Sequence, residues 1–178
     1  MTIFTVGHST RSLDELVELL REHGVTVVAD VRTAPGSRRL PHFARAALAD
    51  ELPKRGLRYV HLPELGGFRR PRPGSPNDGW RNESFRGYAD HMATAEWREG
   101  VERLLELGRW DRVAAMCAEA VPWRCHRSLI ADGLVARGIH VVHLLAPGRA
   151  EAHAITPFAR VEGERVTYPG ADTLPLDG

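Results

Sequence analysis

Short apolar runs alternate with segments of helical periodicity along this chain of 178 residues. The runs at 3–6, 25–30, 57–61, 113–116 and 139–145 predict strands, because each is short, β-favouring and bounded by Gly, Pro or polar residues. The segments 13–23, 43–51, 85–92, 96–107 and 128–137 predict the intervening helices. This alternation is typical of a parallel sheet covered by helices. We therefore predict an α/β, three-layer domain with about five mainly parallel strands flanked by helices.

The length and a hydrophobic fraction of 43% fit one globular domain with a substantial core. We predict a single α/β domain over 1–147 and a C-terminal extension over 148–178. In the extension, residues 160–166 favour a small hairpin that turns at 162–163, and the last ten residues favour a frayed tail. Within the domain, Ser12 and Glu15 have capping-box spacing, which predicts that a helix begins near Leu13.

Two features of the sequence favour a cytoplasmic location with reduced thiols. No apolar run approaches the roughly 20 residues needed to span a bilayer, and residues 1–7 read as a strand and not as a signal peptide. The 2 cysteines are too few for a disulfide framework. We therefore expect no membrane partner.

The formal net charge is +1, but the charges are unevenly distributed. Residues 32–88 contain 12 Lys and Arg against 5 Asp and Glu, and the remainder contains 12 against 18. Every basic residue except Lys54 is an arginine, a side chain suited to phosphate and carboxylate groups. We expect segment 32–88 to form an anion-attracting rim, with an anionic small molecule or a nucleic acid as the partner. A general bias of the composition toward arginine is the alternative.

Polar residues follow four of the predicted strands, and ligands of such folds bind beyond the carboxyl ends of the strands. We therefore predict that these residues line one cleft, together with residues 125–127 at the start of the last helix. The predicted substrate-binding residues are His8, Ser9, Asp30, Arg32, Glu64 and Arg127.

The stretch 117–127 holds both cysteines, a carboxylate, an imidazole and arginines between a predicted strand and a predicted helix. The predicted catalytic residues are Cys117, Glu119, Cys125 and His126, with one cysteine as the reactive thiol and with Glu119 and His126 moving protons. Because Arg124, His126 and Arg127 surround Cys125, we expect Cys125 to be accessible and more reactive than Cys117.

Other uses of the two cysteines are weaker interpretations. A phosphatase-type loop has five residues between its Cys and its Arg, whereas Trp123 occupies that position after Cys117 and Arg124 comes one residue late. No C-x-x-C pair exists, and adjacent Cys and His side chains do not readily chelate one ion, so no metal site is predicted. A zinc site and a redox-active disulfide remain alternatives, and no cofactor is indicated.

Seven short motifs occur together and in order between residues 3 and 145. They are Gly7-His8-Ser9, Asp30-Val-Arg32 with Pro35 and Ser37, Tyr59 with His61, Pro63-Glu-Leu-Gly-Gly67, Phe85 with Tyr88, Met116-Cys-Ala-Glu119 and Cys125-His-Arg127. In these motifs the chain resembles the domain-of-unknown-function 488 family. The resemblance implies an α/β fold and a polar, cysteine-containing site, and it implies no settled reaction.

Two functions from different classes fit these observations. The first is a thiol-dependent enzyme that acts on an anionic substrate such as a nucleotide or nucleic acid. The second is a non-catalytic module that binds nucleic acid or a phosphorylated ligand and whose cysteines are structural. A deep pocket with a perturbed cysteine favours the enzyme, and a broad, flat basic face favours the module.

Overall fold

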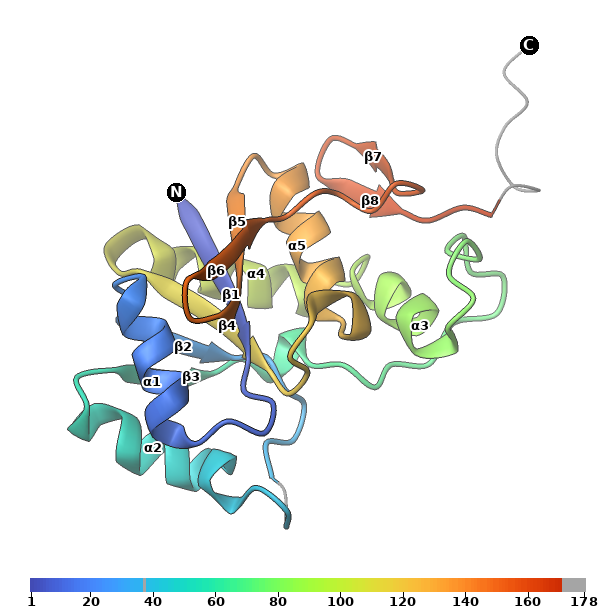
Figure 1. Ribbon diagram of the computed structural model, residues 1–178. Coiled ribbons are helices and arrows are strands. Elements are labelled where there is room, and N and C mark those ends of the chain that lie inside the picture. The colour runs from blue at the N-terminus through green and yellow to red at the C-terminus, as the bar shows by residue number, and fades with distance from the viewer. Residues whose placement is uncertain (37, 171–178) are drawn as a thin grey trace.

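A six-stranded sheet lies at the centre of the computed structural model, which describes residues 1–36 and 38–170 (Figure 1). Its order is β3-β2-β4-β1-β5-β6. The strands are β1 (Thr2–Gly7), β2 (Val27–Asp30), β3 (Arg58–His61), β4 (Val113–Cys117), β5 (His140–Ala146) and β6 (Arg149–Ala152). The first five strands pair in parallel, and β6 pairs antiparallel with β5.

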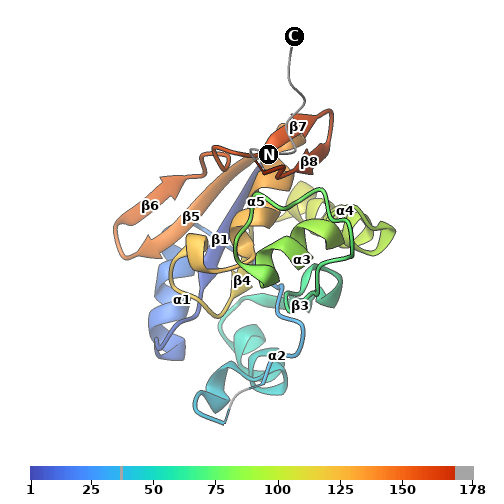
Figure 2. The same cartoon turned by 90° about the vertical axis from the view of Figure 1, so that its right-hand side faces the viewer.

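Helices cover both faces of this sheet (Figures 1 and 2). The helices are α1 (Leu13–Glu22), α2 (Arg45–Lys54), α3 (Glu83–His91), α4 (Ala95–Trp110) and α5 (Arg127–Ala136). Apolar residues of α1 and α2 form one core with the sheet, and those of α3, α4 and α5 form the second core. The predicted three-layer α/β fold is therefore confirmed. None of the described helices is both long and apolar enough to cross a membrane.

The helix boundaries follow local chemistry. The capping box at α1 is present, because Glu15 N donates to Ser12 Oγ at 3.1 Å and Ser12 N donates to Glu15 Oε1 at 2.8 Å. The helix predicted over 43–51 is displaced toward the C-terminus, because Pro41–Phe43 forms a separate 3₁₀ turn and the extended backbone of Ala44 delays α2 to Arg45. Pro53 lies inside the last turn of α2, and the helix ends one residue after it, at Lys54.

The C-terminal part of the chain adds a strand that the sequence did not predict. Strand β6 reads Arg-Ala-Glu-Ala, and all four residues are exposed, so it lacks the apolar signal of the other strands. It is an edge strand and is held by its pairing with β5. The predicted hairpin is present as β7 (Arg160–Glu162) and β8 (Arg165–Thr167), with Gly163 at a φ of 63° in the turn. Most of the predicted frayed tail lies outside the described residues.

A buried carboxylate attaches the segment after β6 to α5. Asp132 is fully buried, and its Oδ1 accepts hydrogen bonds from His153 Nε2 at 2.7 Å and from the Thr156 backbone N–H at 3.0 Å. Its Oδ2 accepts a hydrogen bond from the hydroxyl of Tyr168 at 2.7 Å. Three separate positions of the C-terminal segment therefore converge on one helix residue, and the charge of the carboxylate strengthens each bond.

His143 of β5 extends this network toward the central strand. Its Nε2 bonds to Nδ1 of His153 at 2.8 Å, and its Nδ1 bonds to the hydroxyl of Thr5. Burial, together with nearby His153 and Arg127, lowers the pKa of His143 to about 3. The ring therefore stays neutral in the folded protein over a range in which an unfolded histidine takes up a proton, below about pH 6.5.

We expect this histidine to make the fold acid-sensitive. Its contribution is complete above about pH 6.5 and declines as the pH falls from there toward 3, with a slope of up to ~1.4 kcal/mol per pH unit. Replacement His143→Gln removes the titrating group, so the free energy of unfolding should fall less steeply with acidification. Urea unfolding at several pH values between neutrality and mild acid measures both slopes. Equal slopes for the two proteins would contradict the expectation.

A candidate thiol site at the carboxyl edge of the sheet

A cleft of about 520 Å³ lies at the edge of the sheet where β1, β2 and β4 end. His8, which follows β1, and Cys117, which ends β4, both contribute to its wall, so the two residues face the same space. This is the edge at which parallel α/β sheets bind their ligands. Residues that line the cleft include His8, Arg32, Leu40, Phe68, Phe85, Tyr88, Cys117, Glu119, Arg124, Cys125 and His126.

The pairing of β1 with β4 continues past the ends of the strands and fixes the thiol loop. Gly7 is in register with Cys117, the His8 N–H donates to the carbonyl of Cys117 at 2.9 Å, and the Ser9 N–H donates to the carbonyl of Ala118 at 2.8 Å. The backbones approach so closely that a Cβ at Gly7 would lie 1.6 Å from the carbonyl oxygen of Glu119. Glycine is therefore required at this position.

His8 is held as a neutral ring with a defined tautomer. Ser9 has a φ of 50°, and its carbonyl accepts a hydrogen bond from Nδ1 of His8 at 2.8 Å. Nε2 of His8 is then the acceptor, and Nη1 of Arg32 lies 3.3 Å from it. Burial, together with the charge of Arg32, lowers the pKa of His8. Ser9 therefore acts through its backbone, because it orients the imidazole.

Arg32 is committed to a buried carboxylate. Its Nε and Nη2 donate to the two oxygens of Asp30 at 2.9 and 2.7 Å, and Nη2 also donates to the carbonyl of Phe43 at 2.7 Å. Asp30 is fully buried and accepts a further hydrogen bond from the hydroxyl of Tyr59. The fork-to-fork pair orders the loop after β2, so most of the charge of Arg32 is compensated within the protein.

The two cysteines are buried and interact with each other. Their exposed fractions are 1% for Cys117 and 6% for Cys125, so the expectation of an accessible Cys125 is wrong. The neighbouring Cys117 thiol, together with burial, raises the pKa of Cys125. Burial opposes ionisation of Cys117, but Cys125, the charge of Arg127 and the backbone of Glu119 outweigh it and lower the pKa of Cys117. Of the two thiols, Cys117 therefore has the lower pKa, and its Sγ contacts the carbonyl of Glu119 at 3.6 Å.

His126 contacts the thiol of Cys125 through its ring. Its Nε2 donates to the carbonyl of Val31 at 3.0 Å, which leaves Nδ1 as an acceptor 3.4 Å from the sulfur of Cys125. Burial, assisted by Arg127, lowers the pKa of His126 to about 4, although the Val31 carbonyl opposes the shift. The ring is neutral near pH 7 and can accept a hydrogen bond from the thiol of Cys125.

Arg127 is a fully buried cation beneath this pair. Its Nη2 donates to the carbonyl of Ala120 at 3.2 Å. Its Nε and Nη1 have no hydrogen-bond partner among the described residues, and no carboxylate of that part of the chain forms an ion pair with it. Cys117 and Cys125 are among the groups whose pKa its charge lowers.

The cleft therefore gathers six of the predicted site residues, and four others do not line it. Arg127 lies beneath the thiols, Asp30 lies behind Arg32, and Ser9 supports His8. The expectation that Glu64 faces the cleft is wrong, because its Oε1 pairs with Nη1 of Arg103 at 2.9 Å and so faces α4. The residues that the structure brings together are His8, Arg32, Cys117, Glu119, Cys125 and His126.

The basic segment 32–88, which we expected to form an anion-attracting rim, contributes little to the described wall of the cleft. Five of its cations pair with acids, as Arg32–Asp30, Lys54–Asp50, Arg55–Asp14, Arg58–Asp111 and Arg69–Glu96. Arg32 is the one basic residue of the segment that lines the described cleft. These five cations are therefore compensated within the protein, and the anion-attracting rim stays a prediction.

Sequence reasoning missed several wall residues. Arg124 lines the cleft, is exposed and forms no ion pair with the described residues. Its position directly before Cys125 was the available signal. Phe68 also lines the cleft, and the preceding Gly66 and Gly67 signalled only a loop. Within the described residues no group of three or more His, Cys, Asp or Glu side chains could hold a metal ion, and both cysteines are free thiols.

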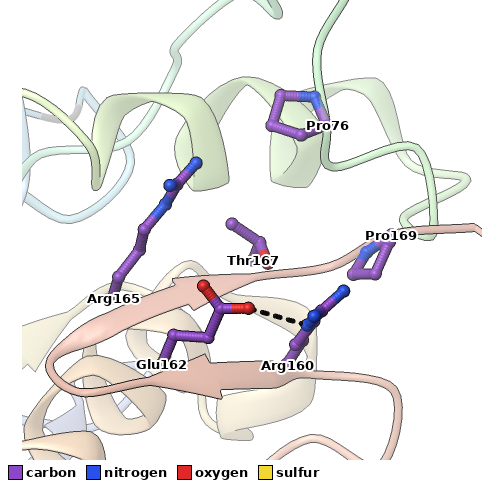
Figure 3. A pocket seen from close by; sticks show the side chains of 6 residues that line it. All are labelled: Pro76, Arg160, Glu162, Arg165, Thr167 and Pro169. Carbon is purple, nitrogen blue, oxygen red and sulfur yellow. Dashed lines mark ion pairs between the residues drawn. The ribbon is translucent and has the colours of Figure 1, made fainter. Parts of the chain in front are cut away.

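A second, smaller groove of about 270 Å³ lies beside the hairpin β7–β8 (Figure 3). Its Arg160 is paired with Glu162 at 3.0 Å. Its lining consists of Pro76, Arg160, Glu162, Arg165, Thr167 and Pro169. Because these residues include neither a thiol nor an imidazole, the cleft at the carboxyl edge of the sheet is the better candidate for chemistry.

Replacement Gly7→Ala should displace the thiol loop. The added Cβ would overlap the Glu119 carbonyl, so we expect a loss of about 1–3 kcal/mol in the free energy of unfolding and a higher pKa of Cys117. Urea unfolding and the ultraviolet absorbance of the thiolate measure the two effects. Gly36→Ala is the matched control, because a Cβ there meets no atom within 4 Å. Equal behaviour of the two variants would contradict this account of the loop.

Comparison with known proteins bears on the same region. A family model described as "Domain of unknown function DUF488" matches residues 12–134, a range that includes both cysteines and extends from α1 into α5. Comparisons with curated proteins and with solved structures gave no match. The family match covers well over half of the chain, although β1 and His8 precede it, and it confirms the resemblance that the motifs indicated. The chain belongs to the DUF488 family, whose function is unknown.

Proposed function

We propose that this protein is a thiol-dependent enzyme that acts on an anionic substrate and uses Cys117 as its nucleophile. The observation that carries the proposal is the fully buried Arg127, which has no carboxylate partner among the described residues and whose charge lowers the pKa of Cys117. A buried charge without a counter-charge is costly, by several kcal/mol. A thiolate at Cys117 offsets that cost, and the thiolate is the nucleophilic form of cysteine.

The side chains around Cys117 can donate or accept protons during the reaction. The single thiol proton of Cys125 can bridge either to the sulfur of Cys117 or to Nδ1 of His126, which is 3.4 Å away. Cys125 therefore stabilises the thiolate before the reaction and connects it to an acceptor. The exposed Glu119 lies on the wall of the same cleft and can serve as the acid or base for a substrate group.

The anionic part of the substrate has a partner in Arg124. This side chain is exposed, lines the cleft and is not consumed by a described ion pair. Arg32 adds one guanidinium nitrogen, because its remaining nitrogens are bonded to Asp30 and Phe43. A guanidinium suits phosphate or carboxylate groups, which supports a small phosphorylated molecule or a nucleic acid as the ligand.

The burial of both thiols favours a second candidate function. Cys125 shares a core with Leu129 and Ile130, as expected for a structural cysteine. In this alternative the protein is a non-catalytic module that binds nucleic acid or a phosphorylated ligand at the same cleft. Its thiols would then titrate as ordinary buried cysteines.

Thiol ionisation separates these two functions. We expect Cys117 to ionise below the pH of about 8.5 typical of a free cysteine, because Arg127 and the Cys125 thiol stabilise its thiolate. Thiolate absorbance against pH measures this directly and does not depend on access to the sulfur. Alkylation by iodoacetamide followed by mass spectrometry should modify Cys117 before Cys125.

Three variants test why the pKa of Cys117 is lowered. Cys125→Ala should raise the pKa of Cys117 because a hydrogen bond is lost, and Arg127→Leu should raise it further because the charge is lost. Arg127→Lys keeps the charge and is the matched control, with thermal unfolding to confirm that each variant is folded. Alkaline ionisation of both cysteines in the unmodified protein would support the binding module and contradict the enzyme.

A further inference from the structure

An aromatic side chain stands exposed at the rim of the thiol cleft. The exposed fraction of Phe68 is 94%, the highest among the large hydrophobic side chains of the described residues. Phe68 nevertheless lines the same cleft as Cys117 and Arg124. It makes no ring contact with another described residue, so its packing within the protein does not account for its position.

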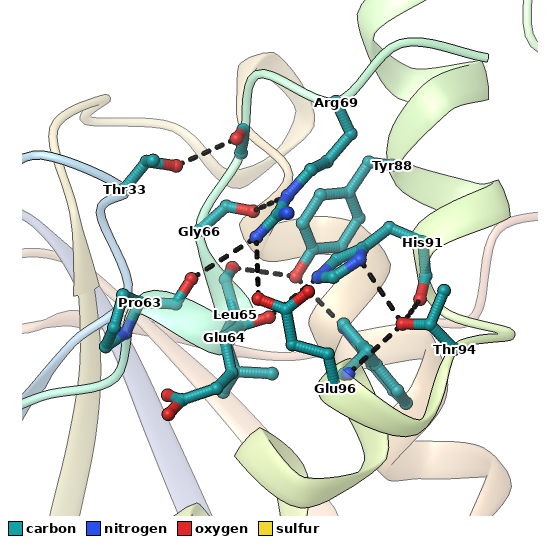
Figure 4. A network of polar contacts seen from close by, with 12 residues as sticks. Thr33, Pro63, Glu64, Leu65, Gly66, Arg69, Tyr88, His91, Thr94 and Glu96 are labelled. Atoms are coloured by element: carbon teal, nitrogen blue, oxygen red, sulfur yellow. Dashed lines mark hydrogen bonds and ion pairs between the residues drawn. The ribbon is translucent and has the colours of Figure 1, made fainter.

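The loop that carries Phe68 is fixed on both sides (Figure 4). Before it, the carbonyl of Gly67 accepts a hydrogen bond from Thr33 Oγ1 at 2.8 Å. After it, Nε of Arg69 donates to the carbonyl of Gly66 at 3.2 Å, and Arg69 also pairs with Glu96 at 3.6 Å. The exposed ring is therefore presented by an anchored backbone.

The backbone of Phe68 is also strained. Its φ of 59° lies in the left-handed region, which non-glycine residues rarely adopt. Ser9 is the other described non-glycine residue with a positive φ, and its hydrogen bonds to Ala118 and His8 account for it. Among the described residues, no hydrogen bond of Phe68 accounts for its positive φ in the same way. Strained backbone conformations of non-glycine residues are found most often at active sites and ligand-binding sites.

We propose that Phe68 is a stacking platform for the base of a nucleotide whose phosphate binds Arg124. This inference rests on the proposed function in taking the substrate to be anionic, and it names the substrate class. An exposed aromatic face stacks on any nucleobase. A volume of about 520 Å³ falls within the range of about 300–1,000 Å³ found for small-molecule sites.

The two groups reach the cleft from different loops, and the proposal therefore names a ligand that carries its ring and its phosphate on a spacer. Phe68 comes from the loop between β3 and α3, and Arg124 comes from the turn between β4 and α5. A nucleotide carries its ring and its phosphate on a sugar, so the two can reach different parts of the wall. In an aryl phosphate, such as a phosphotyrosine side chain, the ring and the phosphate share one oxygen and cannot separate in this way.

Calorimetric titration with a matched pair of ligands tests the proposal. Adenosine monophosphate and ribose 5-phosphate share the phosphate and differ in the base, so the former should bind more tightly. Phe68→Ala should weaken its binding by about 5- to 150-fold, the usual effect of losing one base–aromatic stack, and should leave ribose 5-phosphate unchanged. Phe68→Trp should retain the affinity. Trp110→Ala removes an aromatic ring that is 82% exposed outside the cleft and should change neither ligand.

A second variant separates the ring from the backbone. Phe68→Gly relieves the positive φ, so thermal stability should be kept or raised while adenosine monophosphate binds more weakly. A short oligoadenylate distinguishes a free nucleotide from one within a single strand. Tighter binding of the oligomer, with the same dependence on Phe68, supports the proposal and identifies the strand as the source. Weaker binding with that dependence supports it and identifies the free nucleotide.

Several results would overturn the proposal. They are equal affinity for the two matched ligands, equal weakening of both by Phe68→Ala, or tighter binding of phenyl phosphate than of adenosine monophosphate. The outcome is independent of catalysis, because calorimetry measures binding of adenosine monophosphate and ribose 5-phosphate without any reaction. Phe68-dependent binding together with an unreactive Cys117 would support the base-binding site and contradict the proposed enzymatic function. A reactive Cys117 without base selectivity would support the enzymatic function and contradict the base-binding site.

Discussion

The parallel pairing of β1 with β4 is the constraint on which the site depends. It sets Gly7 beside Cys117, and two further backbone hydrogen bonds carry the register into both loops. His8, the thiol and the turn that leads to Cys125 are therefore placed by main-chain geometry. Only a residue without a side chain at Gly7 permits such an approach. The positions of the reactive groups follow from sheet register, and side-chain packing refines them.

Electrostatics then divides the roles among groups that are close in space. His8 and His126 have lowered pKa values, because burial disfavours their charged forms, and they are available as neutral acceptors. The charge of Arg32 is matched by Asp30, whereas that of Arg127 has no carboxylate in the described chain. Of the two thiols, Cys117 has the lower pKa, because Cys125 and the charge of Arg127 outweigh the effect of its burial. Burial and neighbouring charges thus separate the pKa values of two adjacent thiols.

Helices and strands could be predicted where a local sequence pattern marks them. Site residues could be predicted only where they directly follow a strand. The capping box at Ser12 and the buried strand Val113–Cys117 could be identified from residue order alone. Strand β6 could not, because its exposed Arg-Ala-Glu-Ala residues gain order only by pairing with β5. Glu64 was misplaced because α4 supplies Arg103 as its partner, a contact between residues far apart in the sequence. The burial of Cys125 likewise depends on how α5 packs.

The position of β1 between β4 and β5 also has a consequence for biosynthesis. β1 is made first, but its two partners begin at Val113 and His140, so its apolar residues Ile3 and Val6 leave the ribosome long before either partner exists. Contacts of such large sequence separation form slowly. In nascent chains of this topology, β1 therefore stays unpaired until its partner strands have been made, and an unpaired apolar strand is a site at which chains can associate wrongly.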